Sequence, residues 1–521
     1  MPVRIFRNAR IYTGDPSQPV VSALAVQGER LIAVGDESSV RETITGPVDL
    51  VDLDGACVLP GLYDAHIHTA SLARDLTSLD LRGAGSLPDA LQRIADFVPR
   101  LTTGVWLTGG RWDSNRWDVP VQPNRQALDS VCADRPADLA SIDGHTHWVN
   151  TAALRAAGID RSTPDPIGGE IVRDADGEPT GILREAATGL LGGMAAASDP
   201  RDLADRLLDA QELLLSVGLT SVHDIDGEDC RAAYVKIREA GKLKIRVHKA
   251  IPATALELAI DEGRRTGDGD GWFRTGPVKL FSDGALGSHT CHMSDAFPDG
   301  SHGMAVTPYE DLVRLVERAN SAGIAVATHA IGDRAATLVL DAYQHAASGG
   351  LRNRFEHAQH LQWADIRRMA RLGVVASMQP THCTSDIDLV QELLGDRDIA
   401  SYAWRSILDA DVALAFGSDA PVEEPNPFYG IHAAVTRMRR DGTPAGGFQP
   451  EQRISVGEAI SAFTLGSAYA AGEDQDKGSL TVGRLADFIA VDTDPYECRP
   501  SELPHTNVIT SVVGGEVRWQ S

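Results

Sequence analysis

Eight short apolar segments, each typical of a buried β-strand, recur between residues 56 and 474 of this chain. Amphipathic helical patterns lie between several of them, such as the leucine stripe that starts at Leu203 and stops at Gly218. This alternation predicts an α/β fold, a (β/α)8 TIM barrel, whose functional residues collect at the carboxyl ends of the strands. The predicted strands are one that ends at His66, then Thr220–His223, Ile245–His248, Val278–Phe281, Ile324–His329, Arg354–His357, Val374–Met378 and Val412–Phe416.

Both ends of the chain carry further strand-like runs with a different pattern. Short strand-like runs occur at Val3–Ile5, Ala9–Tyr12 and Leu31–Val34, and again at Val508–Val513, and residues 27–30 have the composition of a hairpin turn. Neither end has enough strands for an independent sheet. We therefore expect residues 1–55 and 475–521 to form one small β-sandwich domain, and residues 56–474 to form the barrel.

One connection is too long for a simple barrel. About 150 positions separate His68 from Thr220, whereas connections of this kind usually take about 2–6 residues. This stretch contains a helical pattern at Leu87–Phe97 and the aromatic-rich segment Gly109–Trp117. The sequence therefore predicts a cap-like insertion after barrel strand 1, at about residues 71–200.

Charge and composition narrow the range of partners. The 521 residues carry a net charge of −25, which argues against binding to nucleic acid or to an anionic membrane. No run of about 18 apolar residues occurs, and the first residues lack the apolar core of a signal peptide. The six cysteines are scattered without a CxxC pair, as in a reducing compartment. We expect a cytoplasmic protein. We also expect a homodimer, because homodimers are common among symmetric assemblies.

The predicted strand ends carry residues that bind metals. His66 and His68 are two apart at the end of a strand, so both imidazoles point to the same face and can reach one ion. His329, His357 and Asp419 lie at or near three later strand ends. Imidazole and carboxylate groups suit zinc, manganese or iron. This series predicts a metal site at the mouth of the barrel.

Lys279 stands out among the six lysines because it lies inside a predicted strand. The other five look like surface positions in helices, loops or strand ends. Burying the charged side chain of a lysine inside a strand costs free energy unless the charge is paired, used for binding or removed. Reaction with CO2 would give a carbamate, an anionic oxygen ligand that can bridge two ions. The alternative is a lysine that is salt-bridged or extends to the surface.

The other candidates also have structural alternatives. A single histidine such as His329 or His357 is most often a core residue whose ring nitrogens are hydrogen-bonded within the protein. At successive strand ends, however, the two suit a second metal position. Metal-bound imidazoles need an acceptor for their other N–H, and Glu356 and Asp333 are nearby in sequence. Asp419 could bind metal, accept a proton from water and pass it to a leaving group, or it could cap a helix before a proline.

With these residues in this order, the chain resembles the amidohydrolase superfamily. That superfamily carries HxH on strand 1, lysine on strand 4, histidines on strands 5 and 6, and aspartate on strand 8, and all six positions are matched here. Further stretches are similar to the amidohydrolase family 3 branch, which includes N-substituted formamide deformylases. They are Arg111–Asp113, Asp143–His145, Pro179–Glu185, Lys279–Gly287, His329–Arg334 and Glu356–Gln359. The resemblance covers essentially the whole chain and implies the barrel, the β-sandwich from both termini, the insertion and hydrolysis at carbon.

We therefore expect a metal-dependent hydrolase that cleaves an amide-type C–N bond in a small molecule: a formamide, an N-acyl compound or a cyclic amide. Its cofactor would be one or two divalent ions, zinc first, with manganese or iron as alternatives. Metal-activated hydroxide would attack, with Asp419 as general base and acid. The expected metal ligands are His66, His68, Lys279, His329, His357 and Asp419. Candidates for substrate contact are Arg111, Trp112, His145 and Asp283, each with a structural role as its alternative.

Two other functions remain open. One is deamination of a heterocycle, or hydrolysis of an ester or lactone, on the same metal site. Deaminases of this superfamily generally use one metal and no lysine ligand, so Lys279 counts against deamination. The other is a non-catalytic binding protein, which should have lost a ligand.

Overall fold

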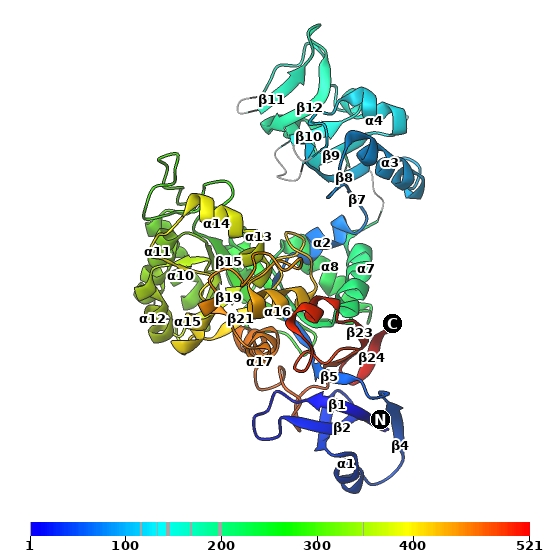
Figure 1. Ribbon diagram of the computed structural model, residues 1–521, viewed down its shortest axis with the longest axis vertical. Coiled ribbons are helices and arrows are strands. Elements are labelled where there is room, and N and C mark those ends of the chain that lie inside the picture. The colour runs from blue at the N-terminus through cyan, green and yellow to red at the C-terminus, as the bar shows by residue number, and fades with distance from the viewer. Residues whose placement is uncertain are drawn as a thin grey trace. The chain divides into compact units, whose positions relative to one another are not determined.

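The computed structural model describes residues 2–114, 117–132, 134–141, 146–166, 169–195, 201–346 and 348–521. The chain divides into two compact units (Figure 1). The barrel unit comprises Met1–Ser71 and Leu207–Ser521, and the inserted unit comprises Leu72–Arg206.

The barrel unit is built on an eight-stranded sheet in which all neighbouring strands are parallel. Its strand order is β21-β19-β17-β16-β15-β14-β13-β6. These strands confirm the eight that the sequence predicts, and several are buried along their whole length, as parallel strands between helices should be. Their bounds are β6 Leu62–Ile67, β13 Leu219–Asp224, β14 Arg246–Pro252, β15 Phe273–Phe281, β16 Val326–Ala330, β17 Arg354–His357, β19 Val375–Met378 and β21 Leu414–Phe416.

Two backbone hydrogen bonds connect the end of β6 with the segment after β21, the first and last strands of this sheet, next to the candidate site. The Asp419 amide donates to the His66 carbonyl at 2.7 Å, and the His68 amide donates to the Ala420 carbonyl at 2.9 Å. Gly417 allows this approach, because a Cβ there would lie 2.5 Å from the His66 nitrogen. The closure therefore brings the first and last strands together at the residues that the sequence predicts as ligands.

Helices on the outside of the barrel follow most of its strands (Figure 1). The predicted leucine stripe is α7, and a second apolar stripe that includes Leu312, Val316 and Ala319 lies in α10. In chain order, the short elements β18 and α13 directly follow the carboxyl ends of β17 and β19. The bounds are α2 Thr69–Asp75, α7 Leu203–Ser216, α8 Glu228–Glu239, α9 Leu256–Asp261, α10 Tyr309–Ser321, α11 Asp333–His345, β18 His360–Leu361, α12 Trp363–Leu372, α13 Pro380–Ser385, α14 Ile387–Leu393, β20 Ala400–Ser401, α15 Trp404–Asp409, α16 Pro427–Thr436, α17 Val456–Ser461 and α18 Ser467–Ala471.

Both termini enter one β domain, as the sequence predicts. Its strands form one continuous sheet in the order β24-β23-β22-β5-β1-β2-β3, and β4 pairs with the first half of β1. The predicted hairpin turn joins β2 to β3, where Gln27 pairs with Arg30. Phe6 and Phe488 meet edge to face at 4.8 Å in its core. The bounds are β1 Val3–Tyr12, β2 Val20–Gln27, β3 Arg30–Gly35, α1 Glu37–Thr43, β4 Val48–Asp52, β5 Cys57–Pro60, β22 Phe488–Val491, β23 Val508–Val513 and β24 Glu516–Gln520.

The inserted unit has its own sheet and core. Its strand order is β11-β12-β10-β9-β8-β7, antiparallel from β11 to β9 and parallel from β9 to β7. Trp112 and Trp148 pack edge to face at 6.2 Å. The bounds are β7 Leu79–Asp80, α3 Leu87–Phe97, β8 Leu107–Trp112, α4 Arg125–Cys132, β9 Ala137–Ser141, β10 Thr146–Val149, α5 Thr151–Ala156, β11 Gly169–Arg173 and β12 Pro179–Glu185.

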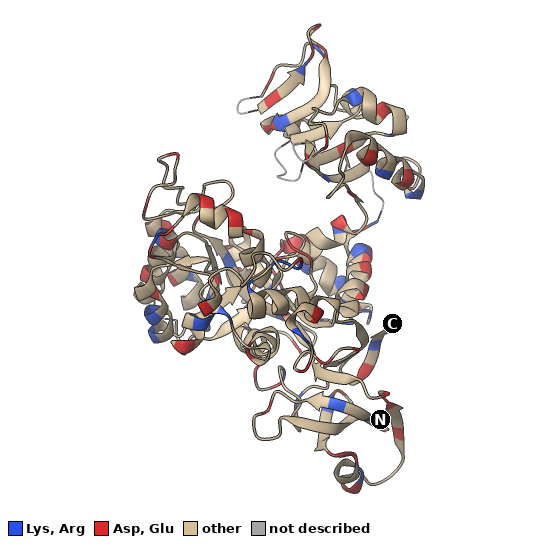
Figure 2. Ribbon diagram, viewed as in Figure 1, with Lys and Arg blue, Asp and Glu red and all other residues tan. Residues whose placement is uncertain are grey.

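Acidic and basic residues are interspersed along the elements of each unit (Figure 2). Within the described part of the chain, no helix is long and apolar enough to cross a membrane.

Candidate metal centre

Three of the predicted ligands, His66, His68 and Asp419, lie together at the end of β6 and in the segment after β21. Asp419 Oδ1 lies 3.5 Å from His66 Nε2 and 3.4 Å from His68 Nε2. His66 and Asp419 are buried, whereas the His68 side chain is 29% exposed. His66 and His68 thus face the same carboxylate oxygen, as their spacing in the strand predicts.

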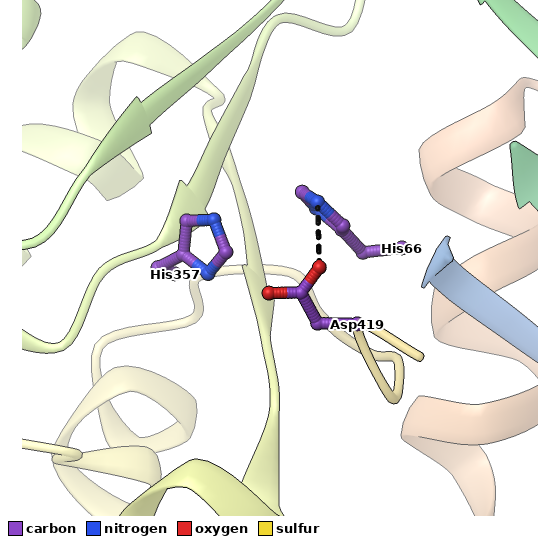
Figure 3. A group of neighbouring side chains, drawn as sticks. All are labelled: His66, His357 and Asp419. Carbon is purple, nitrogen blue, oxygen red and sulfur yellow. Dashed lines mark ion pairs between the residues drawn. The ribbon is translucent and has the colours of Figure 1, made fainter. Parts of the chain in front are cut away.

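His329 at the end of β16 and His357 at the end of β17 extend this group. The His357 ring lies 4.8 Å from that of His66 and 4.5 Å from that of His329. Ligand atoms of His66, His357 and Asp419 all lie within 4.8 Å of one another (Figure 3). His357 has a φ of 71° and Asp419 a φ of 59°, a strained conformation for such residues that is common at functional sites.

Each of the four histidines has one ring nitrogen engaged by an acceptor. The pairs are His66 Nδ1 with Glu356 at 2.6 Å, His68 Nδ1 with Asp226 at 2.9 Å, His329 Nε2 with the Gly284 carbonyl at 3.0 Å, and His357 Nδ1 with Gln379 Oε1 at 2.8 Å. Such hydrogen bonds fix the tautomer and the orientation of metal-binding imidazoles. The remaining nitrogen is Nδ1 in His329 and Nε2 in the other three rings.

Lys279 on β15 is the predicted ligand with the most unusual environment. Its side chain is buried, and among the described residues no carboxylate lies within 4 Å of its ammonium group. The prediction that the other lysines are surface residues is wrong for two of them. Lys249 is buried with Asp224 at 2.9 Å, and Lys477 is buried with Glu473 at 2.7 Å. A carboxylate compensates each of these two charges, so among the described residues Lys279 remains the buried lysine with no carboxylate within 4 Å.

Burial sets the protonation of the central groups. It lowers the pKa of His66 to about 4 and of His329 to about 3, with the nearby Lys279 charge adding to the effect. Burial also lowers the pKa of Lys279 to about 8. Neutral imidazoles can bind a metal, and an amine with a lowered pKa more readily presents the free base that reacts with CO2.

The carboxylate of Asp419 is ionised in this setting. Burial alone would raise its pKa, but the neighbouring His66 and His68 hold it well below its usual value. Its Oδ1 atom is buried without a hydrogen-bond partner among the described residues. The neighbouring carboxylates of Asp226 and Asp419 outweigh burial and raise the pKa of His68 to about 9, so a metal would replace a proton on that ring. An unsatisfied buried carboxylate oxygen that faces two imidazole Nε2 atoms fits a divalent cation, so the donor set suits the expected metal.

Glu356 links two of the predicted ligands. It directly precedes His357 in β17, and its carboxylate holds His66 of β6. Arg354 of the same strand donates to the other Glu356 oxygen at 2.7 Å, and all three side chains are buried. The arginine compensates the buried carboxylate, which would otherwise favour protonation. Asp333, the other acceptor considered from the sequence, instead accepts from the Ser294 amide.

Asp226 follows β13 and should control the position of His68. One oxygen accepts from His68, and the other accepts from the Ala70 amide at 2.6 Å. We expect Asp226→Asn to weaken metal binding about 10–100-fold, because the amide group cannot accept at both places. The measurement is metal affinity by competition with a chelator. Glu228→Gln, which alters a nearby carboxylate paired with Arg264, should retain wild-type affinity; equal losses in both variants would contradict a specific role for Asp226.

The predicted substrate-contact residues occupy different settings. Arg111 pairs with Asp75 at 2.6 Å, and Trp112 is buried and donates to the Leu139 carbonyl at 2.8 Å, both within the inserted unit. Asp283 is buried in the barrel unit, where its oxygens accept from the backbone amides of Ile331, Gly332 and His292. Burial raises the pKa of Asp283 to about 7. His145 lies outside the described residues.

Three groups near the site were not predicted from the sequence. Asp226 holds His68, Gln379 holds His357, and His382 lies beside Asp419. None belongs to a ligand motif, and each comes from a different strand end than the residue it approaches. Only the general requirement for acceptors around metal-bound histidines could have pointed to the first two.

An eight-stranded parallel barrel with this cluster of candidate metal ligands at its strand ends is typical of one class, the metal-dependent hydrolases built on a TIM barrel. Residues 49–518 match the model described as the amidohydrolase family, and the chain belongs to that family.

Relatives with similar length support this assignment. The chain is 32% identical to Protein LONG AFTER FAR-RED 3 of Arabidopsis thaliana over 98% of this chain and 90% of the relative. It is 30% identical to N-substituted formamide deformylase of Arthrobacter pascens over 98% of this chain and 97% of that protein. An uncharacterized metal-dependent hydrolase of Pyrococcus furiosus has a similar structure, with a TM-score of 0.78 and 28% identity over 95% of this chain and 100% of the other.

Proposed function

We propose that this protein hydrolyses an amide-type C–N bond in a small molecule, namely a formamide, an N-acyl compound or a cyclic amide. The observation that carries the proposal is the buried Lys279, which has no carboxylate within 4 Å among the described residues and whose charge lowers the pKa of His66, His329 and His357. A lysine in this position is explained if its amine adds to CO2, releases a proton and becomes an anionic ligand. Such a ligand favours an amide hydrolase over the deaminase alternative.

The proposed metal ligands are His66, His68, Lys279, His329, His357 and Asp419. When bound, a divalent ion supplies Lewis acidity and lowers the pKa of water to about 7. Zinc is the expected ion, with manganese and iron as alternatives, because the set combines imidazoles with oxygen donors.

Asp419 performs the proton transfers in this proposal. Its carboxylate is ionised and therefore able to accept a proton from the attacking water. The protonated carboxyl then passes that proton to the leaving nitrogen as the C–N bond breaks. Glu356, Asp226, Gln379 and the Gly284 carbonyl hold the histidines in place during these steps.

A panel of substrates tests the proposal. Because one relative is named N-substituted formamide deformylase, the first set is N-methyl-, N-butyl- and N-benzylformamide, with formate release as the readout. N-acyl amines and a cyclic amide follow, and an ester, a lactone and an aminated heterocycle represent the alternatives. We expect metal-dependent turnover of at least one amide. Turnover of only the ester, the lactone or the heterocycle would reject amide hydrolysis in favour of the corresponding alternative.

Assembly, location and domain limits stay predictions from the sequence. We expect a homodimer and a cytoplasmic location. We expect the β-sandwich domain to comprise residues 1–55 and 475–521, and the barrel to comprise residues 56–474.

A further inference from the structure

His382 is a buried histidine at the candidate site that the proposed mechanism does not use. It lies in α13, after β19, and its ring stacks on that of His357 at 6.0 Å with an interplanar angle of 10°. Its Nε2 atom lies 3.7 Å from Asp419 Oδ2. The other Asp419 oxygen faces His66 and His68. The two oxygens of Asp419 therefore face different groups, the predicted ligands on one side and His382 on the other.

The hydrogen bond at the other ring nitrogen indicates which atom of His382 carries the proton. The Gln359 amide nitrogen donates to His382 Nδ1 at 3.3 Å. A neutral imidazole that accepts at Nδ1 carries its proton on Nε2. That Nε2 atom is buried and has no hydrogen-bond partner among the residues that the structure describes. A buried donor without an acceptor is costly, and one beside a reactive carboxylate points to an acceptor that arrives with the substrate.

The local backbone holds this donor in place. Gln359 follows His357 closely, and Gln379 comes just before α13. His357 donates to Gln379, and Gln359 donates to His382, so the ends of β17 and β19 are tied by reciprocal hydrogen bonds. The His382 donor is therefore fixed before substrate binds, and it would need no reorganisation during the reaction.

We propose that His382 is a further catalytic residue, whose Nε2–H donates a hydrogen bond to the acyl oxygen of the substrate amide. This inference rests on the proposed function. The leaving nitrogen must approach Asp419 to receive its proton, and the acyl oxygen is attached to the same carbon as that nitrogen. A donor beside Asp419 Oδ2 is therefore within reach of this oxygen, where negative charge develops as water attacks.

The test compares His382→Leu and His382→Gln with a matched control, His360→Leu. His360 is also buried, has one nitrogen bonded to Ser401 and has a buried Nε2 without a described partner. Using the best amide of the substrate panel, we expect His382→Leu to lower kcat about 100-fold with little change in KM, as for loss of one donor to a developing oxyanion. His382→Gln, which keeps an N–H donor, should recover part of this loss. His360→Leu should keep the wild-type kcat.

Metal content and thermal unfolding are measured on the same samples. Wild-type metal content and a cooperative transition in His382→Leu, together with the lower kcat, would support the proposal. A wild-type kcat in His382→Leu, equal losses in His360→Leu, or loss of metal from the His382 variants would overturn it. If the wild-type enzyme itself hydrolyses no amide, the proposed function fails, and this inference fails with it.

Discussion

Lys279→Ala is expected to lose bound metal and about 1,000-fold of the amide hydrolase activity. Loss of the metal's charge stabilisation costs several kcal/mol, and each 1.4 kcal/mol is tenfold in rate. The substitution removes the buried lysine that has no carboxylate partner within 4 Å among the described residues. The measurement is metal content per chain by elemental analysis, with wild type and variant produced in medium containing bicarbonate.

Two controls separate a ligand from a merely charged lysine. Lys279→Arg keeps a cation but cannot form the carbamate, so it should lose metal as the alanine variant does. Lys244→Ala removes a half-exposed lysine that pairs with Glu212 and should retain metal and activity. Two ions in wild type that fall to one or none in both Lys279 variants would support a lysine-bridged pair. One ion in wild type and in Lys279→Ala would remove Lys279 from the ligand set.

Asp419→Asn is expected to lower kcat by about 1,000- to 10,000-fold, near the upper limit for loss of a general acid–base group. The asparagine keeps the shape of the side chain but cannot carry the proton from water to the leaving nitrogen. Because the other five predicted ligands remain, metal content should fall much less than kcat. Metal analysis and kinetics on one preparation would separate these two effects.

The control for Asp419 is a second buried aspartate. Asp365 in α12 is buried, pairs with Arg368 at 2.9 Å and accepts from the Thr337 hydroxyl, and neither partner is a predicted ligand. Asp365→Asn should lower the thermal stability and leave the kcat of the folded enzyme unchanged. A kcat near the wild-type value in Asp419→Asn, with full metal content, would rule out proton transfer by this residue.

The fold could be predicted because its signals are local. Each barrel strand is a short apolar run, and a leucine stripe such as that of α7 marks a helix within one segment. The positions of His66 and His68 follow from strand geometry alone, since residues two apart share a face. The approach of Asp419 to His66 follows from the closure of a barrel, which brings its first and last strands together.

Contacts between distant segments could not be predicted in the same way. Asp226 is 158 positions from His68, and Glu356 is 290 positions from His66. Although the barrel places strand ends near one another, side-chain orientation decides which carboxylate meets which imidazole. Lys249 looked like a surface residue because its compensating partner, Asp224, lies on the neighbouring strand. The proposed role of His382 depends on one nitrogen atom without a hydrogen-bond partner among the described residues, which leaves no pattern in the sequence.

The hydrogen bonds of Asp226 also have a consequence for protein engineering. This carboxylate holds His68 and the backbone amides of Ala70 and Ser71, which form the last residues of the barrel unit before the chain continues into the insertion at Leu72. A shortened enzyme that replaces the insertion with a linker would therefore have to keep the native chain through Ser71. A splice only two residues earlier would leave the two amide contacts to Asp226 to linker residues, which lack the native placement of Ala70 and Ser71, and would weaken the support for a predicted metal ligand.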